Sequence, residues 1–381
     1  QLDEMSNVQF GEGGAGTFSD GKLNTGVNNP RIGWILSQFV AFGAREEILY
    51  DAKPHIGTDV LLEVVQNLRR RIESLGGEVR FSTQVTALHI ENGRLMGLGT
   101  TAGDIPCDCA VFAIGHSARD TFAMLHEEQI PMEPKPFSMG VRIEHRQSVI
   151  NEAQYGASDL PLPPADYKLV KHLENETVYT FCMCPGGYVV AAASEQGGVV
   201  TNGMSYADRD GENANAAVLV TVNPEDFPYS GALGGMHWQR EIEQRAYAVS
   251  GGYCAPAQTV GDFLAGKPSV GAGSVQPTYR PGVHWCDLHK VLPEKITKAI
   301  ESALPLLDKS LQGFADKDAV LTAPETRSSS PVRILRDESR QSSVLGLYPC
   351  GEGAGYAGGI MSAAIDGMMT AEAIIGGYSN E

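Results

Sequence analysis

Two thiols stand one residue apart in the segment Phe181-Cys182-Met183-Cys184, and a Gly-Gly turn follows them. Alternate residues of a strand point to the same side, so Cys182 and Cys184 are expected on one face, where they could form a redox pair or bind a soft metal. No further Cys or His nearby completes a tetrahedral site. The other interpretation is that they are small buried apolar residues. We assign no metal site.

Cationic side chains near the C-terminus offer a second kind of chemistry. Arg327 and Arg333 lie in the run ETRSSSPVR, and each could hold a substrate carboxylate by bidentate hydrogen bonding. Alternatively, they form structural pairs with Glu325 or Asp337, and the residues leave both interpretations open. His116 follows an expected strand end, but a lone histidine is more often a structural group, so we give it no catalytic role.

Two segments match the pattern Gly-x-Gly-x-x-Gly, which holds a pyrophosphate only when a strand precedes it and a helix follows. The first consists of Gly11, Gly13 and Gly16. Only ten residues precede it, and the sequence TFSDG after it is poorly suited to begin a helix. We therefore expect an extended loop over residues 6–25 that contacts a ligand, and not the first turn of a Rossmann unit.

The second match consists of Gly353, Gly355 and Gly358, and it follows a strand-like run and precedes a helical one. Too few residues remain for the second strand and the acidic residue of a complete βαβ unit. The pattern still predicts a glycine-lined helix N-terminus whose free amides point at an electron-rich ligand atom. The pyrimidine edge of a flavin is such a ligand.

Regular elements must position these groups. Apolar residues recur at helical spacing over residues 58–75, with Gly76 and Gly77 as a stop signal. A short strand is expected at 78–81, an alternating strand at 85–90 that returns through Asn92-Gly93 as a hairpin, and an apolar strand at 109–114. This order of elements is typical of a nucleotide-binding sheet.

The middle of the chain has a different character from about residue 132 to 314. It has longer polar loops and strand-like runs at 178–182, 188–193 and 217–222, and the tail then returns to the earlier style with a strand at 345–350 and a helix at 360–375. A chain of 381 residues is longer than one core usually organises. We predict an α/β protein with a second, mixed α+β lobe.

Composition excludes several classes of protein. The formal net charge of -17 would repel a nucleic acid, and the one dense basic run, residues 69–71, falls on a solvated helix face. We see neither a membrane-spanning stretch nor a signal peptide, and the seven cysteines form no disulfide framework. We therefore expect a cytoplasmic protein with reduced thiols that binds neither nucleic acid nor membrane. Glycine, at 44 of 381 residues, exceeds its usual share of roughly 7%.

Seven phrases carry a resemblance to a known family: NVQFGEGGAGTFSDGKLNT, KPHIGTDVL, FAIGHSARDTF, FCMCPGGYVVAAASE, TNGMSYADRDGENANAA, ETRSSSPVRILRD and GLYPCGEGAGYAGGIMSAAIDG. The chain resembles an uncharacterised bacterial family of FAD-dependent, NAD(FAD)-utilizing dehydrogenases, which is similar to the glutathione-reductase-like flavoproteins. The resemblance runs from about Ser6 to Ile375. It implies that the family's first Gly-x-Gly-x-x-Gly segment lies before Gln1, and we expect this chain to be a fragment or a processed form that binds FAD weakly or not at all.

The resemblance also implies a discontinuous, Rossmann-like FAD-binding domain, truncated at its N-terminus, in two parts, 1–130 and 318–381, with an inserted substrate or cap domain at 131–317. It places residues 325–333 near the flavin. The cofactor contacts that it implies fall on the pyrophosphate and ribityl loop, the adenine, a strand end and the pyrimidine edge: Gly13, Gly14, Gly16, Thr17, Ser19, Lys22, Val85, Ala113, Gly115, Gly351, Glu352, Gly358, Gly359, Ile360 and Met361.

The activity that the resemblance implies is an FAD-dependent oxidoreductase that transfers hydride at the flavin. NAD(P)H as the electron donor follows from the family's name alone, and the substrate, the catalytic residues and the oligomeric state do not follow from the sequence. The alternative hypothesis is a flavin-binding RNA-modification or interaction protein without dehydrogenase activity. The acidic balance of the chain argues against this alternative.

Overall fold

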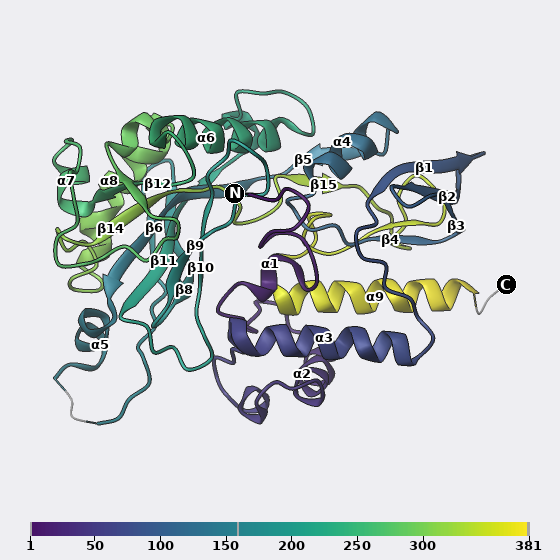
Figure 1. The fold of residues 1–381 in the computed structure, drawn as a ribbon, viewed down its shortest axis with the longest axis horizontal. Coiled ribbons are helices and arrows are strands. Elements are labelled where there is room, and N and C mark those ends of the chain that lie inside the picture. The colour runs from purple at the N-terminus through teal and green to yellow at the C-terminus, as the bar shows by residue number, and fades with distance from the viewer. Residues whose placement is uncertain (1, 158–159, 379–381) are drawn as a thin grey trace.

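A computed structural model of the chain describes residues 2–157 and 160–378. It is a mixed α/β fold in which a large sheet lies to one side of two long helices and several small sheets (Figure 1). This confirms the predicted fold class. Among the helices of the described residues, none combines the length and the apolar character needed to cross a bilayer.

The large sheet has seven strands in the order β13-β12-β14-β6-β11-β8-β7. At its centre β6 (Phe137–Arg146) and β11 (Asn213–Val222) pair antiparallel over their whole length. The other strands are β7 (Val170–His172), β8 (Thr177–Cys184), β12 (Ala255–Thr259), β13 (Val283–Trp285) and β14 (Val320–Glu325). The long apolar run of β11 is buried on both faces, as expected for a central strand.

Helices cover this sheet and fill its core. In α8 (Glu294–Asp308) the apolar residues recur on one side, and Ile296, Ile300 and Leu304 are fully buried against Met139 and Val218 of the two central strands. The second long helix of this part is α6 (Gly234–Ser250). The predicted strands at 178–182 and 217–222 are thus confirmed within β8 and β11. That at 188–193 is confirmed as β9 (Tyr188–Ala191), which pairs with β10 (Thr201–Met204).

The predicted hairpin is also confirmed. Strands β1 (Val85–Glu91) and β2 (Arg94–Thr100) pair antiparallel, and Asn92 and Gly93 join them with φ angles of 51° and 75°. Two successive left-handed residues form the turn that matches the twist of a hairpin. Nearby, β4 (Ala110–Phe112) and β16 (Leu347–Pro349) confirm the strands at 109–114 and 345–350 in shorter form, and they pair parallel.

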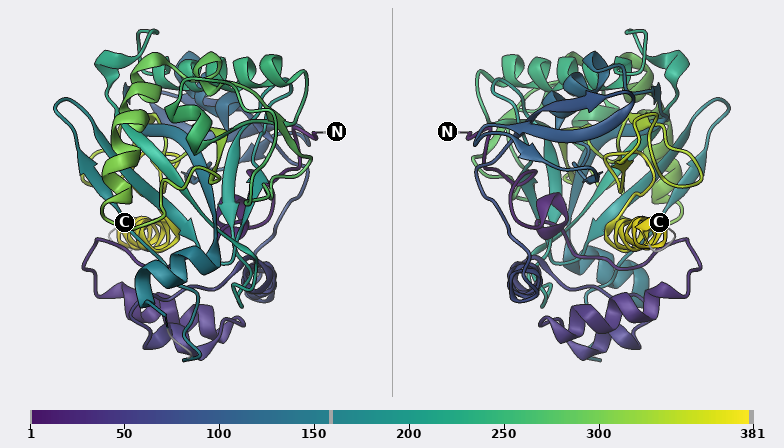
Figure 2. Two further views of the ribbon diagram at one scale, coloured as in Figure 1. Left: turned by 90° about the vertical axis from the view of Figure 1, so that its left-hand side faces the viewer. Right: turned by 90° about the vertical axis from the view of Figure 1, so that its right-hand side faces the viewer.

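Two long helices pack together in the part of the molecule outside the seven-stranded sheet. The expected helices are confirmed as α3 (Thr58–Ser74) and α9 (Ile360–Tyr378), whose axes are roughly aligned in Figure 1 and are seen end-on in Figure 2. Leu61 and Val64 share one apolar core with Met361 and Ile365. The remaining elements are α1 (Gly14–Thr17), α2 (Arg31–Ala41), η1 (Glu46–Leu49), β3 (Ile105–Pro106), α4 (Arg119–Glu127), β5 (Met132–Pro134), α5 (Gln147–Tyr155), η2 (Pro224–Asp226), α7 (Val260–Leu264), η3 (Leu288–Lys290) and β15 (Val332–Ile334).

Two local predictions are wrong. Residues 78–81 form no strand: no ladder with another described segment includes them, and Glu78 and Arg80 bond to each other at the surface. The loop expected over residues 6–25 contains one helical turn, α1, because the left-handed Gly13 turns the chain and lets Thr17 become buried. The domain boundaries remain predictions, although β14, which begins after residue 317, is a strand of the seven-stranded sheet.

Candidate cofactor site

The loops after β4 and β16 meet at the centre of the candidate site. A Cβ atom on Gly353 would lie 2.3 Å from the carbonyl oxygen of Gly115, so only glycine permits this approach of two backbones. Immediately beside it, Nδ1 of His116 lies 2.7 Å from Oε1 of Glu352. The structure therefore brings Gly115 together with Gly351 and Glu352, all three predicted cofactor residues.

One buried polar atom beside this contact and one in the predicted pyrophosphate loop are among those with no hydrogen-bond partner in the described residues. They are Nε2 of His116, whose side chain is 9% exposed, and Oγ1 of Thr17, which is 1% exposed. An unpaired buried donor or acceptor costs about 1–3 kcal/mol unless water or a ligand satisfies it. Both atoms therefore point to a polar ligand.

The N-terminus of α9 presents glycine backbone to the surface. Gly358 and Gly359 are exposed, a Cβ on either would meet no atom within 4 Å, and neither has a left-handed φ angle. The Gly358 amide donates to Oγ of Ser362 at 3.1 Å, and the following amides of the first turn have no acceptor within the helix. Ile360 lies near Gly16, because a Cβ atom added to Gly16 would be 3.4 Å from the Ile360 side chain. Neither packing nor backbone conformation explains the glycine pair.

A cavity of about 490 Å³ lies beside β4 and the loop that follows it. Val85, Leu98, Ile114 and Phe10 give it an apolar wall. Its polar lining residues include Ser117, Arg119, Ser194 and Glu195, which we call its polar end. Of the predicted residues, Val85 lines the cavity, whereas Ala113 and Gly115 flank the lining residue Ile114. An apolar cavity with a few convergent polar groups is the usual form of a small-molecule site.

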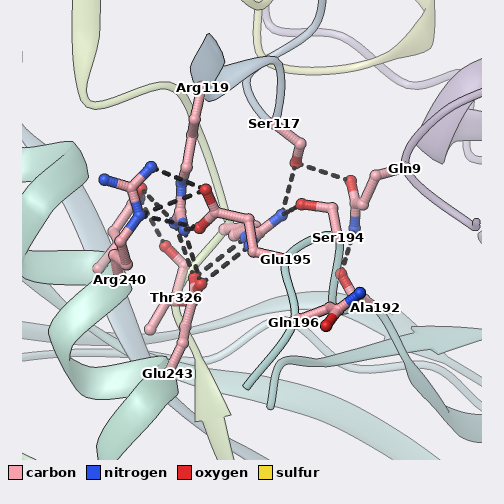
Figure 3. Close-up of polar contacts among 12 residues, drawn as sticks. Gln9, Ser117, Arg119, Ala192, Ser194, Glu195, Gln196, Arg240, Glu243 and Thr326 are labelled. Atoms are coloured by element: carbon pink, nitrogen blue, oxygen red, sulfur yellow. Dashed lines mark hydrogen bonds and ion pairs between the residues drawn. The ribbon is translucent and has the colours of Figure 1, made fainter. Parts of the chain in front are cut away.

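The polar end of the cavity belongs to a buried network of arginines and glutamates (Figure 3). Glu243 of α6 accepts hydrogen bonds from Arg119 at 2.8 and 2.9 Å and from Arg327 at 3.0 and 2.8 Å. Burial would raise the pKa of Glu243, but the two guanidinium groups hold it well below its usual range. Glu195 bonds to both Arg119 and Arg240.

This network decides where Arg327 lies. Its guanidinium is buried, and besides Glu243 it donates to the hydroxyls of Ser117 and Ser194, so its donors bind the protein. Its carboxylate partner is neither Glu325 nor Asp337, the two that the sequence suggested. Arg333 is 40% exposed, pairs with Glu133 at 3.4 Å and lies over the ring of Tyr356. The two candidate arginines therefore have different partners.

The predicted phosphate and ribityl loop ends at an acidic residue. Asp20 is fully buried and binds Lys22 at 2.9 Å and Arg209 at 2.9 Å. Burial would raise the pKa of Asp20, but Lys22 and Arg209 lower it to about 2. Ser19 caps the preceding turn by donating to the carbonyl oxygen of Gly16 at 2.7 Å. Lys22 also donates to the carbonyl oxygen of Met183, so this loop contacts the strand of the two thiols.

The structure places Cys182 and Cys184 near each other on β8, where the Cys184 thiol donates to the carbonyl oxygen of Cys182 at 3.2 Å. No group of three or more His, Cys, Asp or Glu residues suited to a metal occurs in the described parts of the chain. Arg119, Glu195 and Glu243 were missed by the sequence analysis. Arg119 is 76 residues from Glu195 and 124 residues from Glu243 in the chain, so no local sequence pattern indicates that they interact.

Comparison of the sequence with known proteins gives a matching family and a relative. The family described as "FAD-dependent protein, C-terminal domain-like" matches residues 136–328. An uncharacterized protein of Clostridium beijerinckii is 49% identical over 381 residues, which cover 98% of this chain and 72% of that protein.

Solved structures resemble the chain only remotely. L-proline dehydrogenase from P. horikoshii is 14% identical, with a TM-score of 0.29 over 83% of this chain and 53% of that one. Glycine oxidase from Bacillus cereus is 13% identical, with a TM-score of 0.30 over 86% and 58%. A quinol fumarate reductase from E. coli is 11% identical, with a TM-score of 0.38 over 89% and 54%. The chain thus spans somewhat more than half the length of these solved proteins.

Proposed function

The chain belongs to the family of FAD-dependent proteins whose C-terminal domain it matches, and from that membership we propose that it is an FAD-binding oxidoreductase. In this proposal, residues 1–130 and 318–381 contact the cofactor, and residues 131–317 cover it and bind a small-molecule substrate. The two groups of predicted cofactor residues around Gly115 and Gly359 would then face different ends of one FAD molecule.

The residues present fit such a cofactor. The apolar wall at Val85 and Ile114 suits an adenine ring, and the unpaired Nε2 of His116 and Oγ1 of Thr17 suit the hydroxyl and phosphate oxygens of a dinucleotide. The glycine amides at the start of α9 suit the oxygen and nitrogen atoms of the flavin pyrimidine.

When bound, FAD supplies hydride transfer, and the protein supplies position and electrostatics. The N-terminal end of α9 carries the positive end of the helix dipole, and the first turn holds no acidic residue. Negative charge on the reduced flavin would be stabilised there by about 0.3–1 kcal/mol or more when buried. The hydrogen bond that Nδ1 of His116 donates to Glu352 orients the ring, so that Nε2 is held in place.

The observation that carries the proposal is the pair Gly358 and Gly359, because the protein's own packing leaves room for a side chain at both. A cofactor in contact with the backbone would take up that room. The test is FAD titration into the purified wild type and Gly359→Val, followed by flavin absorbance, at FAD concentrations high enough to detect the weak binding expected of this chain. We expect the variant to keep its unfolding midpoint and to bind FAD roughly tenfold more weakly or worse, as overpacking by 1–3 kcal/mol would require.

The matched control is Gly377→Val, at the far end of the same helix, where a Cβ also meets no atom within 4 Å. This variant should bind FAD like the wild type. Equal FAD affinity of the wild type and Gly359→Val would overturn the assignment of this helix end to the flavin.

A further inference from the structure

The strand that carries the two thiols is irregular where they lie. Between β11 and β8, Asn215 pairs with Cys184 and Ala217 pairs with Phe181, so β8 has one residue more than its partner in this stretch. Cys182 has a φ angle of +45°, which is uncommon for a residue other than glycine. A β-bulge of this kind bends the strand and redirects its side chains.

The bulge brings the two thiols together. On a regular strand, residues two apart are about 6.5 Å from each other along the chain, which is too far for direct contact of short side chains. Here the Cys184 thiol reaches the Cys182 carbonyl oxygen at 3.2 Å, so its sulfur lies against the backbone of Cys182. The local strain thus coincides with a contact between the Cys184 sulfur and its partner cysteine.

Two cations stand beside the pair. Lys22 donates to the carbonyl oxygen of the intervening Met183, and Nη1 of Arg142 donates to that of Cys182 at 3.1 Å. Arg142 is itself paired with Glu325, and Lys22 with Asp20. The hydrogen bond with Cys184, together with Lys22 and Arg142, lowers the pKa of Cys182 to about 6, against the opposing effects of burial and of Asp20.

The two thiols differ in their access to solvent. Cys182 is partly exposed, and the side chain of its neighbour Lys22 is 33% exposed, whereas Cys184 is buried. Burial and the hydrogen bond with Cys182 raise the pKa of Cys184. A partly exposed cysteine of lowered pKa beside a buried one suits thiol–disulfide exchange.

We propose that Cys182 and Cys184 form a redox-active dithiol that exchanges with low-molecular-weight disulfides. The Cys182 thiolate attacks one sulfur of the small disulfide, forms a mixed disulfide and releases one small thiolate. Cys184 then loses its proton, attacks the Cys182 sulfur, and releases the second small thiolate as the Cys182–Cys184 bond forms. Two electrons pass from the protein to the small disulfide, which is reduced to two thiols. This activity needs no flavin, although it shares Lys22 with the predicted cofactor residues.

The chain contains its own control for this chemistry. Cys107 and Cys109 have the same spacing and are also partly exposed, but Asp108 stands between them. Burial and this carboxylate raise the pKa of both thiols. Cys182 matches Cys107 and Cys109 in spacing and in partial exposure, so a faster reaction of Cys182 would come from the bulge, the cations and the absence of an intervening carboxylate such as Asp108.

The first experiment uses the unmodified, fully reduced protein. Iodoacetamide is added near pH 7, and alkylation of each cysteine is followed over time by peptide mass spectrometry. We expect Cys182 to react at least about tenfold faster than Cys107 or Cys109, as its larger thiolate fraction requires. The variant Lys22→Gln should slow the reaction of Cys182. The control variant Lys53→Gln should not, because Lys53 forms its ion pair with Asp166 at the surface.

The second experiment oxidises the reduced protein with glutathione disulfide. In the wild type, the peptide that spans both thiols should lose the mass of two hydrogens, as a Cys182–Cys184 disulfide requires, and carry no glutathione. In Cys184→Ser, the same peptide should carry glutathione on Cys182. The proposal is wrong if Cys182 is alkylated no faster than Cys107, or if the wild type retains glutathione on Cys182 as the Cys184→Ser variant does.

Discussion

His116 and Glu352 bond to each other at 2.7 Å between Nδ1 and Oε1, although 236 residues separate them in the chain. Each follows a strand of the same parallel pair, β4 and β16. The contact therefore fixes the ring of His116 at the point where two distant segments of the proposed FAD-binding part meet, and leaves Nε2 of the ring for a ligand.

From this contact we predict a specific effect of Glu352→Gln on cofactor binding. The amide keeps a hydrogen-bond acceptor for His116 but loses the charge, so FAD affinity should fall roughly tenfold, the equivalent of one charge-assisted hydrogen bond of about 1.5 kcal/mol. Flavin absorbance titration measures it, with the exposed Glu338→Gln as the control. A loss of folding stability with unchanged FAD affinity would show that the pair is structural.

Glu243 should be the most sensitive carboxylate of the fold. It compensates two buried guanidinium groups, so Glu243→Gln leaves positive charge unpaired and should lower the free energy of unfolding by about 3–5 kcal/mol. Urea unfolding at neutral pH measures this loss. Glu241→Gln, on the same helix but at a half-exposed pair with Arg245, should cost far less, and equal losses for the two variants would refute the prediction.

The buried His145 should make stability depend on pH. Burial lowers its pKa to about 4, against the opposing effects of the hydrogen bond that Nε2 donates to the Phe314 carbonyl oxygen and of the charges of Asp316 and Asp308. Its folded pKa lies below the unfolded value of about 6.5, so the unfolded chain binds the proton first, and stability present above pH 6.5 is lost as the pH falls toward 4.

The shift of His145 amounts to about 3 kcal/mol. Unfolding free energies measured between pH 7 and 4 should therefore decline less steeply in His145→Gln than in the wild type. The exposed His172→Gln serves as the control and should keep the wild-type slope. An unchanged slope in His145→Gln would mean that other groups cause the pH dependence.

Gly353 should tolerate no side chain. Its Cβ would lie 2.3 Å from the Gly115 carbonyl oxygen, so Gly353→Ala must push two backbones apart, at a cost of about 1–3 kcal/mol. The urea midpoint of this variant should fall. That of Gly252→Ala, where a Cβ meets no atom within 4 Å, should not, and a similar midpoint for both variants would contradict the close approach.

Local patterns predicted the regular elements well, because helix periodicity over α3 and the Asn92-Gly93 turn depend on neighbouring residues. They failed at residues 78–81, since a strand needs a partner that sequence alone does not supply. The contact of His116 with Glu352 and the place of Arg327 beside Glu243 depend on chain topology over long separations. The resemblance named Gly115 and Glu352 as cofactor residues, but their geometry came only from the fold.

The pairing of β4 with β16 also bears on how the protein folds. Residues 110–112 meet residues 347–349 only across a loop of more than two hundred residues, and closing so long a loop is entropically costly. Folding of the seven-stranded sheet shortens that loop, because the sheet is formed from the intervening chain. We therefore expect the seven-stranded sheet to form early, and the two loops that carry His116 and Glu352 to come together late on the folding pathway.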